Sequence, residues 1–109
     1  MLPSLTKTEI LILTAVCSTE RYGLEIVDRV KEISAGKTTL SLGGLYTTLH
    51  RMEEKGLVVA RWGETDEIRR GARRKYYKTT GLGLRALREV KTAMDYVKHL
   101  PQLAYVGAR

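Results

Sequence analysis

The sequence has few of the residues on which disulfides, metal sites and most active sites depend. It contains a single cysteine, Cys17, so an internal disulfide is excluded and a reducing compartment is expected. The two histidines, His50 and His99, are distant from Cys17 in the sequence, and no metal-ligand cluster or nucleophile elbow is present. Residues 81–86 match the relaxed G-x-G-x-x-A pattern, but no complete βαβ unit can follow them. We therefore expect no enzyme, no metal site and no cofactor.

The sequence also has no long apolar run. Its most apolar stretch, residues 10–17, is far shorter than the roughly 20 residues that cross a bilayer. Glu9 adjoins this stretch and no clean cleavage site of small residues follows it, which argues against a signal peptide. We therefore predict a cytoplasmic protein without a membrane partner.

Length and composition predict one globular domain. The 109 residues leave no room for a second substantial domain. Apolar residues make up 43% and charged residues 28%, which excludes a disordered or collagen-like chain. Lys and Arg total 19 against 12 Asp and Glu, a formal net charge of +7. A surplus of this size indicates a polyanionic partner.

The positive charge is concentrated after the first third of the chain. Residues 1–34 carry four basic and five acidic side chains, residues 35–80 carry ten and five, and residues 81–109 carry five and two. A charge run alone is more often a solvated loop, so its neighbours must decide whether it meets an anion. Six of the basic side chains fall within ten residues: Arg69, Arg70, Arg73, Arg74, Lys75 and Lys78.

The first and last predicted helices indicate a dimer. Thr6 and Glu9 have the spacing of a capping box, and residues 10–17 behind them are apolar nearly all the way round. A last helix is expected between Thr80 and Pro101, with apolar residues at spacings of three and four, as in a helix-pairing seam. A small chain buries such surfaces most simply by dimerising. We expect the interface to contain Ile10, Leu13, Leu87, Val90, Met94 and Val97.

The residues between these helices predict two further helices. A turn over residues 18–22 leads into a helix over 23–33, whose apolar residues follow a 3.6-residue period, and one short strand is predicted over 38–40. Ser41 as N-cap then opens a helix over 42–55. Four of its apolar residues are expected to point toward the core: Leu42, Leu45, Leu49 and Met52.

A β-hairpin is predicted next. Residues 57–62 and 75–79 are rich in β-formers, and the polar, basic residues 63–74 between them form the expected hairpin loop. Three helices, a hairpin with a basic tip and a further helix are the order of a winged helix-turn-helix module. The expected fold is mainly α with a small β-hairpin. It consists of a winged helix-turn-helix domain over residues 1–80 and a C-terminal dimerisation helix with its tail over residues 81–109.

This fold predicts double-stranded DNA as the binding partner of the basic residues. The major groove of B-DNA accepts one α-helix, whose exposed N-terminal half reaches the base edges. The arginine-rich hairpin would follow the adjacent backbone or minor groove, where each neutralised phosphate releases counterions. The glycines of the helix over 42–55 permit close backbone approach, and its polar side chains can donate hydrogen bonds. Predicted contacts are Gly43, Gly44, Tyr46, Thr47, His50 and Arg51 in the helix, with Arg69, Arg70, Arg73, Arg74 and Lys75 in the hairpin.

Four motifs resemble the PadR-type transcriptional regulators. They are YGLEI over residues 22–26, LSLGGLYTTL over 40–49, RMEEKGLV over 51–58 and RKYY over 74–77. They occur in the family's order and, with Trp62 and the residues around Thr80, extend the resemblance over most of residues 5–87.

The resemblance implies a dimeric repressor that binds an inverted repeat in its target promoter. It also implies the short branch of the family, in which the last helix alone completes the dimer, and it adds Ser41 and Tyr76 to the residues near DNA. Two positions depart from the family pattern, Thr47 where many relatives have proline and Thr79 where they have leucine.

Two alternatives stay open. The same fold can serve as a protein-interaction module, which should expose apolar residues on the recognition surface. Some relatives respond to phenolic or drug-like compounds, so Trp62, Tyr96 and Tyr105 suggest a small aromatic effector as a further partner. The competing interpretation is that Trp62 closes its strand against the hairpin and that Tyr96 packs in the dimer interface.

Overall fold

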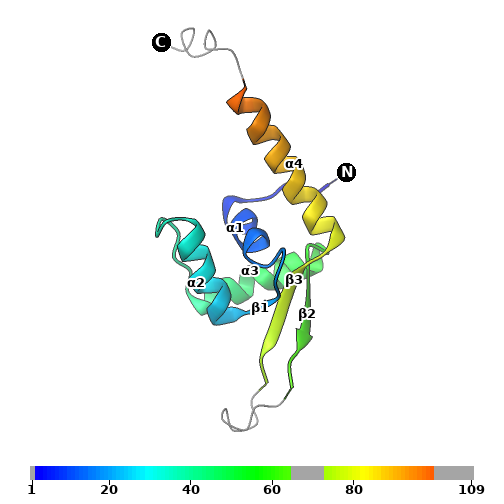
Figure 1. Ribbon diagram of the computed structural model, residues 1–109. Helices are drawn as coiled ribbons and strands as arrows, with labels where there is room; N and C mark the ends of the chain where they lie inside the picture. Colours follow the sequence, from blue (N-terminus) through cyan, green and yellow to red (C-terminus); the bar gives the residue numbers. More distant parts are fainter. Residues whose placement is uncertain (1, 65–72, 100–109) are drawn as a thin grey trace.

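The computed structural model describes residues 2–64 and 73–99, and over these residues it contains four helices and one small sheet (Figure 1). The predicted fold class, a winged helix-turn-helix with a C-terminal helix, is confirmed. In chain order the elements are α1 (Lys7–Ala15), β1 (Arg21–Tyr22), α2 (Gly23–Ile33), α3 (Leu42–Glu54), β2 (Val58–Trp62), β3 (Lys75–Thr79) and α4 (Gly81–Lys98).

The helices begin where the capping residues predicted. Thr6 and Glu9 form a complete capping box at α1, in which each side chain accepts a hydrogen bond from the other residue's backbone N–H. Ser41 at α3 and Thr80 at α4 each accept one from the backbone N–H three residues on, at 3.1 and 3.0 Å. Gly56, with a φ of +76°, follows the end of α3 in the left-handed conformation that glycine adopts without strain.

The sheet differs from the prediction at its edge. It is antiparallel with the order β1-β3-β2, and Arg21 and Tyr22 of β1 pair with β3. The sequence predicted a turn over these two residues and a strand over residues 38–40, which form no strand in the structure. Two residues are too few to show a β pattern, and β1 exists because β3 offers it a free edge.

The core is formed by one face of each of the first three helices, the sheet and the start of α4. Thr79, one of the two departures from the family pattern, is accommodated there because its hydroxyl donates to the Leu13 carbonyl at 3.0 Å. The buried apolar residues are Ile12, Leu13, Ala15, Val16, Ile26, Val30, Leu45, Leu49, Met52, Leu57, Val58, Tyr77 and Ala86.

Two assignments made from the apolar patterns are wrong. Leu13 was expected in a dimer interface but is buried in the core of its own chain, because α1 packs between α2 and α4. Leu42 was expected in the core but is exposed, because it is the first residue of α3 and lies at the rim of the body. Intrachain packing thus accounts for part of the apolar surface of α1 that had suggested a partner.

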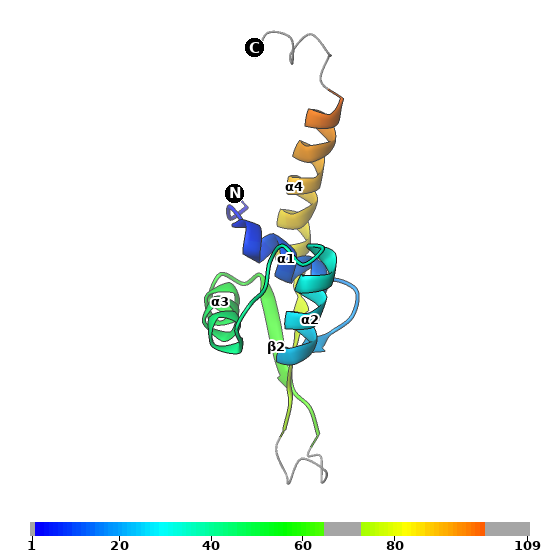
Figure 2. The ribbon, with the colours of Figure 1, turned by 90° about the vertical axis from the view of Figure 1, so that its left-hand side faces the viewer.

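The hairpin and α4 leave the body in opposite directions (Figures 1 and 2). The first turns of α4 pack tightly, since Gly83 and Ala86 are buried and a Cβ at Gly83 would collide with the Leu57 carbonyl. Farther along, Met94 and Val97 are exposed. The arrangement leaves these two apolar side chains near the end of α4 exposed to solvent.

Candidate nucleic-acid interface

The exposed crest of α3 carries small and polar side chains. Gly43 and Thr47 are exposed one helical turn apart, and the Thr47 hydroxyl donates to the Gly43 carbonyl at 3.0 Å. A Cβ built on Gly43 would meet no described atom within 4 Å, so the backbone is open there. We call these two residues the ridge of α3. Its low profile allows another molecule to approach the helix backbone.

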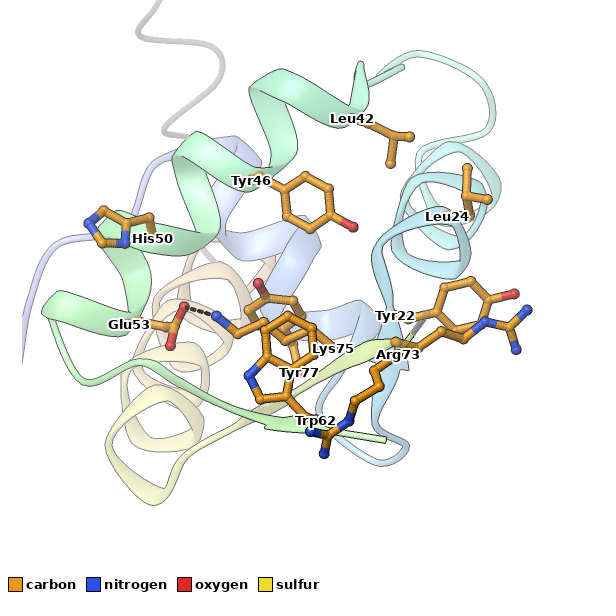
Figure 3. Close-up of a pocket in the computed structure, with 11 residues that line it drawn as sticks. Tyr22, Leu24, Leu42, Tyr46, His50, Glu53, Trp62, Arg73, Lys75 and Tyr77 are labelled. Atoms are coloured by element: carbon orange, nitrogen blue, oxygen red, sulfur yellow. Dashed lines mark ion pairs between the residues drawn. The ribbon is translucent and has the colours of Figure 1, made fainter. Parts of the chain in front are cut away.

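One flank of the ridge faces the β2–β3 hairpin, here called the wing. Between them lies a cavity of about 570 Å³, the wing-side cavity (Figure 3). The Lys75 ammonium of β3 and the Glu53 carboxylate of α3 bridge it at 3.7 Å. The cavity is lined by Tyr22, Leu24, Leu42, Tyr46, His50, Glu53, Trp62, Arg73, Arg74, Lys75 and Tyr77.

The cations of the wing are held by aromatic rings. The Arg73 guanidinium and the Lys75 ammonium lie 5.9 and 5.6 Å from the centroid of the Trp62 ring. The Arg74 guanidinium lies 4.3 Å from that of Tyr22. Arg73 also donates through Nε to the Gly63 carbonyl at 2.8 Å. These cation–π contacts limit the motion of the basic side chains at the base of the wing.

The Tyr76 side chain lies on the other face of the sheet. It sits opposite Arg61 in the register, whereas Lys75 and Tyr77 alternate toward α3. Its ring packs edge to face against that of Tyr22, with 5.8 Å between the ring centroids. The Arg61 guanidinium lies 4.9 Å from the centroid of the Tyr76 ring. The predicted Tyr76 contact is therefore separated from α3.

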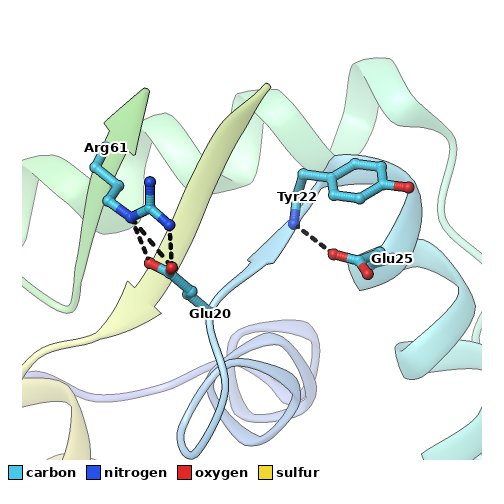
Figure 4. Close-up of polar contacts among 4 residues, drawn as sticks. All are labelled: Glu20, Tyr22, Glu25 and Arg61. Atoms are coloured by element: carbon cyan, nitrogen blue, oxygen red, sulfur yellow. Dashed lines mark hydrogen bonds and ion pairs between the residues drawn. The ribbon is translucent and has the colours of Figure 1, made fainter. Parts of the chain in front are cut away.

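An ion pair between Glu20 and Arg61 lies on the same face of the sheet as Tyr76. Glu20 accepts hydrogen bonds from Arg61, one of them from Nε at 2.8 Å (Figure 4). These bonds lower the pKa of the Glu20 carboxyl, because they favour its charged form. The adjacent start of α2 is held by the Tyr22 backbone N–H, which donates to Glu25 at 3.2 Å.

The opposite flank of the ridge faces the start of α1. A cleft of about 530 Å³, the α1-side cleft, lies there; five of its ten lining residues carry hydroxyl groups, and Arg51 and Lys55 are its cations. The Lys55 ammonium lies 3.0 Å from the carboxylate of the buried Glu9. Burial raises the pKa of the Glu9 carboxyl, but hydrogen bonds from the Thr6 backbone and Lys55 outweigh it and lower the pKa overall. The lining residues are Thr6, Thr8, Glu9, Thr39, Leu40, Ser41, Gly44, Thr48, Arg51 and Lys55.

The predicted DNA-contacting residues thus separate into groups around α3. Gly43 and Thr47 form the ridge. Tyr46, His50, Arg73, Arg74 and Lys75 line the wing-side cavity, whereas Ser41, Gly44 and Arg51 line the α1-side cleft. The predicted contacts Arg69 and Arg70 lie outside the described residues. The sequence does not predict that Leu24 and Glu53 line the wing-side cavity, because their positions depend on how α2 and α3 pack.

The predicted dimer residues are distributed unevenly. Ile10, Leu87 and Val90 are partly exposed, and Met94 and Val97 are exposed, whereas Leu13 is not accessible. Val90 also lines a groove of about 230 Å³ between α4 and residues 2–5.

Two of the aromatic residues suggested as an effector pocket, Trp62 and Tyr96, do not line a common cavity. Trp62 lines the wing-side cavity, and Tyr96 is exposed on α4 without lining that cavity. Tyr105 lies outside the described residues.

The described ranges contain no candidate for a metal site or for a membrane span. Residues 2–64 and 73–99 contain no group of three or more His, Cys, Asp or Glu side chains that could hold a metal ion. Over the same ranges, no helix combines the length and the apolar character that spanning a membrane requires.

Comparisons with known proteins agree on one family. The model of the transcriptional regulator PadR-like family matches residues 12–89. An uncharacterized protein of Lysinibacillus sphaericus is 29% identical over 97 residues, which are 89% of this chain and 86% of that protein.

Solved structures of the family share the fold. A PadR family transcription regulator from hypervirulent Clostridium difficile has a TM-score of 0.71 at 32% identity, with 85% of this chain and 92% of that chain covered. A PadR-like transcriptional regulator from Bacillus cereus has a TM-score of 0.67 at 29% identity, with 83% and 82% covered. Bacillus subtilis PadR, solved in complex with operator DNA, is similar in fold, with a TM-score of 0.66 at 19% identity and coverages of 85% and 49%. With the family model spanning most of the sequence and the same fold in its structures, the chain belongs to the transcriptional regulator PadR-like family.

Proposed function

We propose that this protein is a sequence-specific DNA-binding repressor that binds an inverted repeat as a homodimer. The observation that carries the proposal is the low ridge of Gly43 and Thr47, flanked by cations on both sides. A helix with this profile fits the major groove, where its first turns reach the base edges. The structure of Bacillus subtilis PadR with operator DNA is a precedent in a protein of the same fold.

Within this proposal, the two flanks of α3 have different roles on DNA. Arg73, Arg74 and Lys75 belong to the wing side, where their charges would neutralise phosphates and counterion release would make the affinity depend on salt. Arg51 belongs to the α1 side and reaches base edges in the groove that α3 enters. Ser41 keeps its hydroxyl engaged as the N-cap of α3 and serves to present that helix.

The proposed dimer uses the distal half of α4. Met94 and Val97 are large apolar side chains exposed on one helix, and such a seam is buried when a second copy of the helix pairs with it. The division of the chain into residues 1–80 for DNA and residues 81–109 for dimerisation, and a cytoplasmic location beside the chromosome, belong to the same proposal.

Selection of bound DNA from a random pool tests the function directly. We expect an enriched inverted repeat whose half-sites are about 34 Å apart, one turn of the double helix, because a two-fold dimer presents two α3 helices to one face of the duplex. Thr47→Ala is expected to change the preferred bases. Lys98→Ala, at the exposed end of α4, is a control that should leave the base preference unchanged. A pool without enrichment, or a monomer by light scattering at micromolar concentration, would contradict the proposal.

A protein-interaction module remains the second candidate, because apolar side chains are exposed beside the ridge. Leu24, Leu42 and Trp62 lie in the wing-side cavity, where a surface devoted only to phosphates needs none. This candidate predicts no salt-dependent binding to any duplex. Absence of measurable binding to any duplex at low salt would therefore favour it over the repressor.

A further inference from the structure

The two residues of the ridge lie outside both neighbouring cavities. Gly43 and Thr47 are exposed, and neither lines the wing-side cavity or the α1-side cleft. They are four residues apart, so their side-chain positions are neighbours on the surface of α3. A Cβ built on Gly43 would meet no described atom within 4 Å beyond its chain neighbours and the helix backbone, which leaves room beside Thr47 for an atom of another molecule. The crest of α3 therefore presents Thr47 to whatever the helix approaches.

The hydroxyl hydrogen of Thr47 is already used inside the helix. The hydroxyl donates to the Gly43 carbonyl at 3.0 Å, just as the Thr48 hydroxyl donates to the Gly44 carbonyl at 3.0 Å. To donate to a base, the Thr47 hydroxyl would have to give up this bond, so the number of hydrogen bonds would not increase. The Cγ2 methyl group is the part of the exposed side chain that is left for a new contact.

We propose that Thr47 recognises a thymine in each half-site through contact between its Cγ2 methyl group and the C5-methyl group of the base, and not through its hydroxyl. Thymine is the one base of DNA that carries a methyl group in the major groove, and a threonine methyl is among the apolar groups that contact it. The inference rests on the proposed function, because it requires α3 in the major groove. Thr47 is also one of the two departures from the family pattern, so the resemblance implies no role for this side chain.

Replacing single thymines by uracil tests the contact on the DNA. Uracil keeps the pairing and the hydrogen-bonding groups of thymine and lacks only the C5-methyl group. Each thymine of the operator enriched from the random pool is replaced in turn, in both half-sites, and the Kd is measured by fluorescence anisotropy. We expect one position at which uracil weakens binding about fourfold per half-site, because the burial of one methyl group is lost there.

Two substitutions separate the methyl group from the hydroxyl. Thr47→Val has the shape of threonine and keeps the methyl but cannot donate, whereas Thr47→Ser keeps the hydroxyl and loses the methyl. The valine variant is expected to bind the thymine operator within about twofold of the unmodified protein and to retain the loss with uracil. The serine variant should bind that operator about fourfold per half-site more weakly. It should show no further loss with uracil, because the same contact is already missing.

Thr14 provides a matched control in another helix. It is exposed on α1, and its hydroxyl donates to the Ile10 carbonyl at 2.7 Å, the same bond across four residues. It is not among the residues assigned to DNA or to the dimer. Thr14→Val and Thr14→Ser should therefore leave both the Kd for the operator and the loss with uracil unchanged. An effect of these variants equal to that of the Thr47 variants would overturn the inference.

The remaining outcomes distinguish this inference from the proposed function. An enriched operator on which no uracil weakens binding overturns the methyl contact and leaves the proposed function standing. A Thr47→Ser variant that retains the loss with uracil does the same, because another side chain must then contact the methyl group. Weak binding by the valine variant beside normal binding by the serine variant assigns the recognition to the hydroxyl and overturns the inference. A random pool without enrichment contradicts the proposed function and, with it, this inference.

Discussion

The two flanks of α3 have cavities of similar size that are lined by different kinds of side chain. The wing-side cavity, at about 570 Å³, combines exposed aromatic and aliphatic side chains with three cations. In the α1-side cleft, at about 530 Å³, five of the ten lining residues are serine or threonine. One helix thus separates a surface with aromatic rings from one with many hydroxyl groups. This difference shows that the wing brings aromatic rings and clustered cations beside α3, whereas the start of α1 brings hydroxyl groups.

Both flanks depend on the packing of α3 against the core. A substitution that weakens this packing should therefore have the largest effect on stability. Leu45 is buried beneath the exposed residues of α3. Leu45→Ala is expected to lower the free energy of unfolding by about 3 kcal/mol, because it leaves a cavity in the core. Leu42→Ala, at an exposed position of the same helix, should cost no more than about 0.5 kcal/mol. Urea unfolding measures both, and equal losses would mean that the assignment of buried and exposed residues in α3 is wrong.

Alkaline pH should lower the free energy of unfolding through a group on the wing side, the Tyr77 phenol. Burial raises the pKa of the Tyr77 phenol to about 12, and the nearby Glu53 and Tyr46 add to the shift. In the unfolded chain that pKa is about 10, so the folded state holds the proton more tightly. Its contribution is complete below pH 10 and is lost as the pH rises toward 12, by on the order of 2 kcal/mol.

Two phenylalanine variants check this prediction by urea unfolding between about pH 9 and about pH 11. Tyr77→Phe should abolish the alkaline loss, whereas Tyr76→Phe, on the other face of the sheet, should retain it. Persistence of the loss in Tyr77→Phe would assign the titration to another group.

The two flanks should also differ in how they bind DNA. Arg51→Ala, on the α1 side of α3, is expected to change the relative affinities for operator variants by about 1–3 kcal/mol, because this side chain can reach base edges. Arg73→Ala, at the base of the wing, should weaken binding to all sequences alike and lower the salt slope by about one, because one phosphate contact is lost. Salt titrations on the selected operator and on two mismatched duplexes measure both effects. A base-specific effect of Arg73→Ala would reverse the two roles.

The smallest effect on stability is expected at low pH, from protonation of Glu9 on the α1 side. The pKa of the Glu9 carboxyl is lowered although burial opposes the shift, because hydrogen bonds from the Thr6 backbone and Lys55 favour the charged form. The resulting stability is present above the unfolded pKa of about 4.3 and is lost as the pH falls through the folded value. Glu9→Gln should flatten the acid limb of the stability profile, and the exposed Glu89→Gln should leave it unchanged. An identical acid limb in Glu9→Gln would exclude Glu9 as the titrating group.

The sequence predicted the local elements well and their environments less well. The caps Thr6, Ser41 and Thr80 depend on hydrogen bonds across three residues, so the order of the residues is enough to place them. Leu42 and Leu45 belong to one apolar pattern, yet the first is exposed and the second is buried. Periodicity gives the direction of a side chain around its helix but cannot show where the neighbouring elements end.

The amino-acid sequence alone predicts the succession of helices, the hairpin, the basic character of the region around the hairpin, and the family. These follow from interactions within a few residues and from composition. The tertiary structure alone decided that β1 pairs with β3, that Leu13 is enclosed within its own chain, and that Leu24 and Trp62 line one cavity with the arginines of the wing. Such features require residues distant in sequence to meet, and which of them meet is decided when the whole core packs.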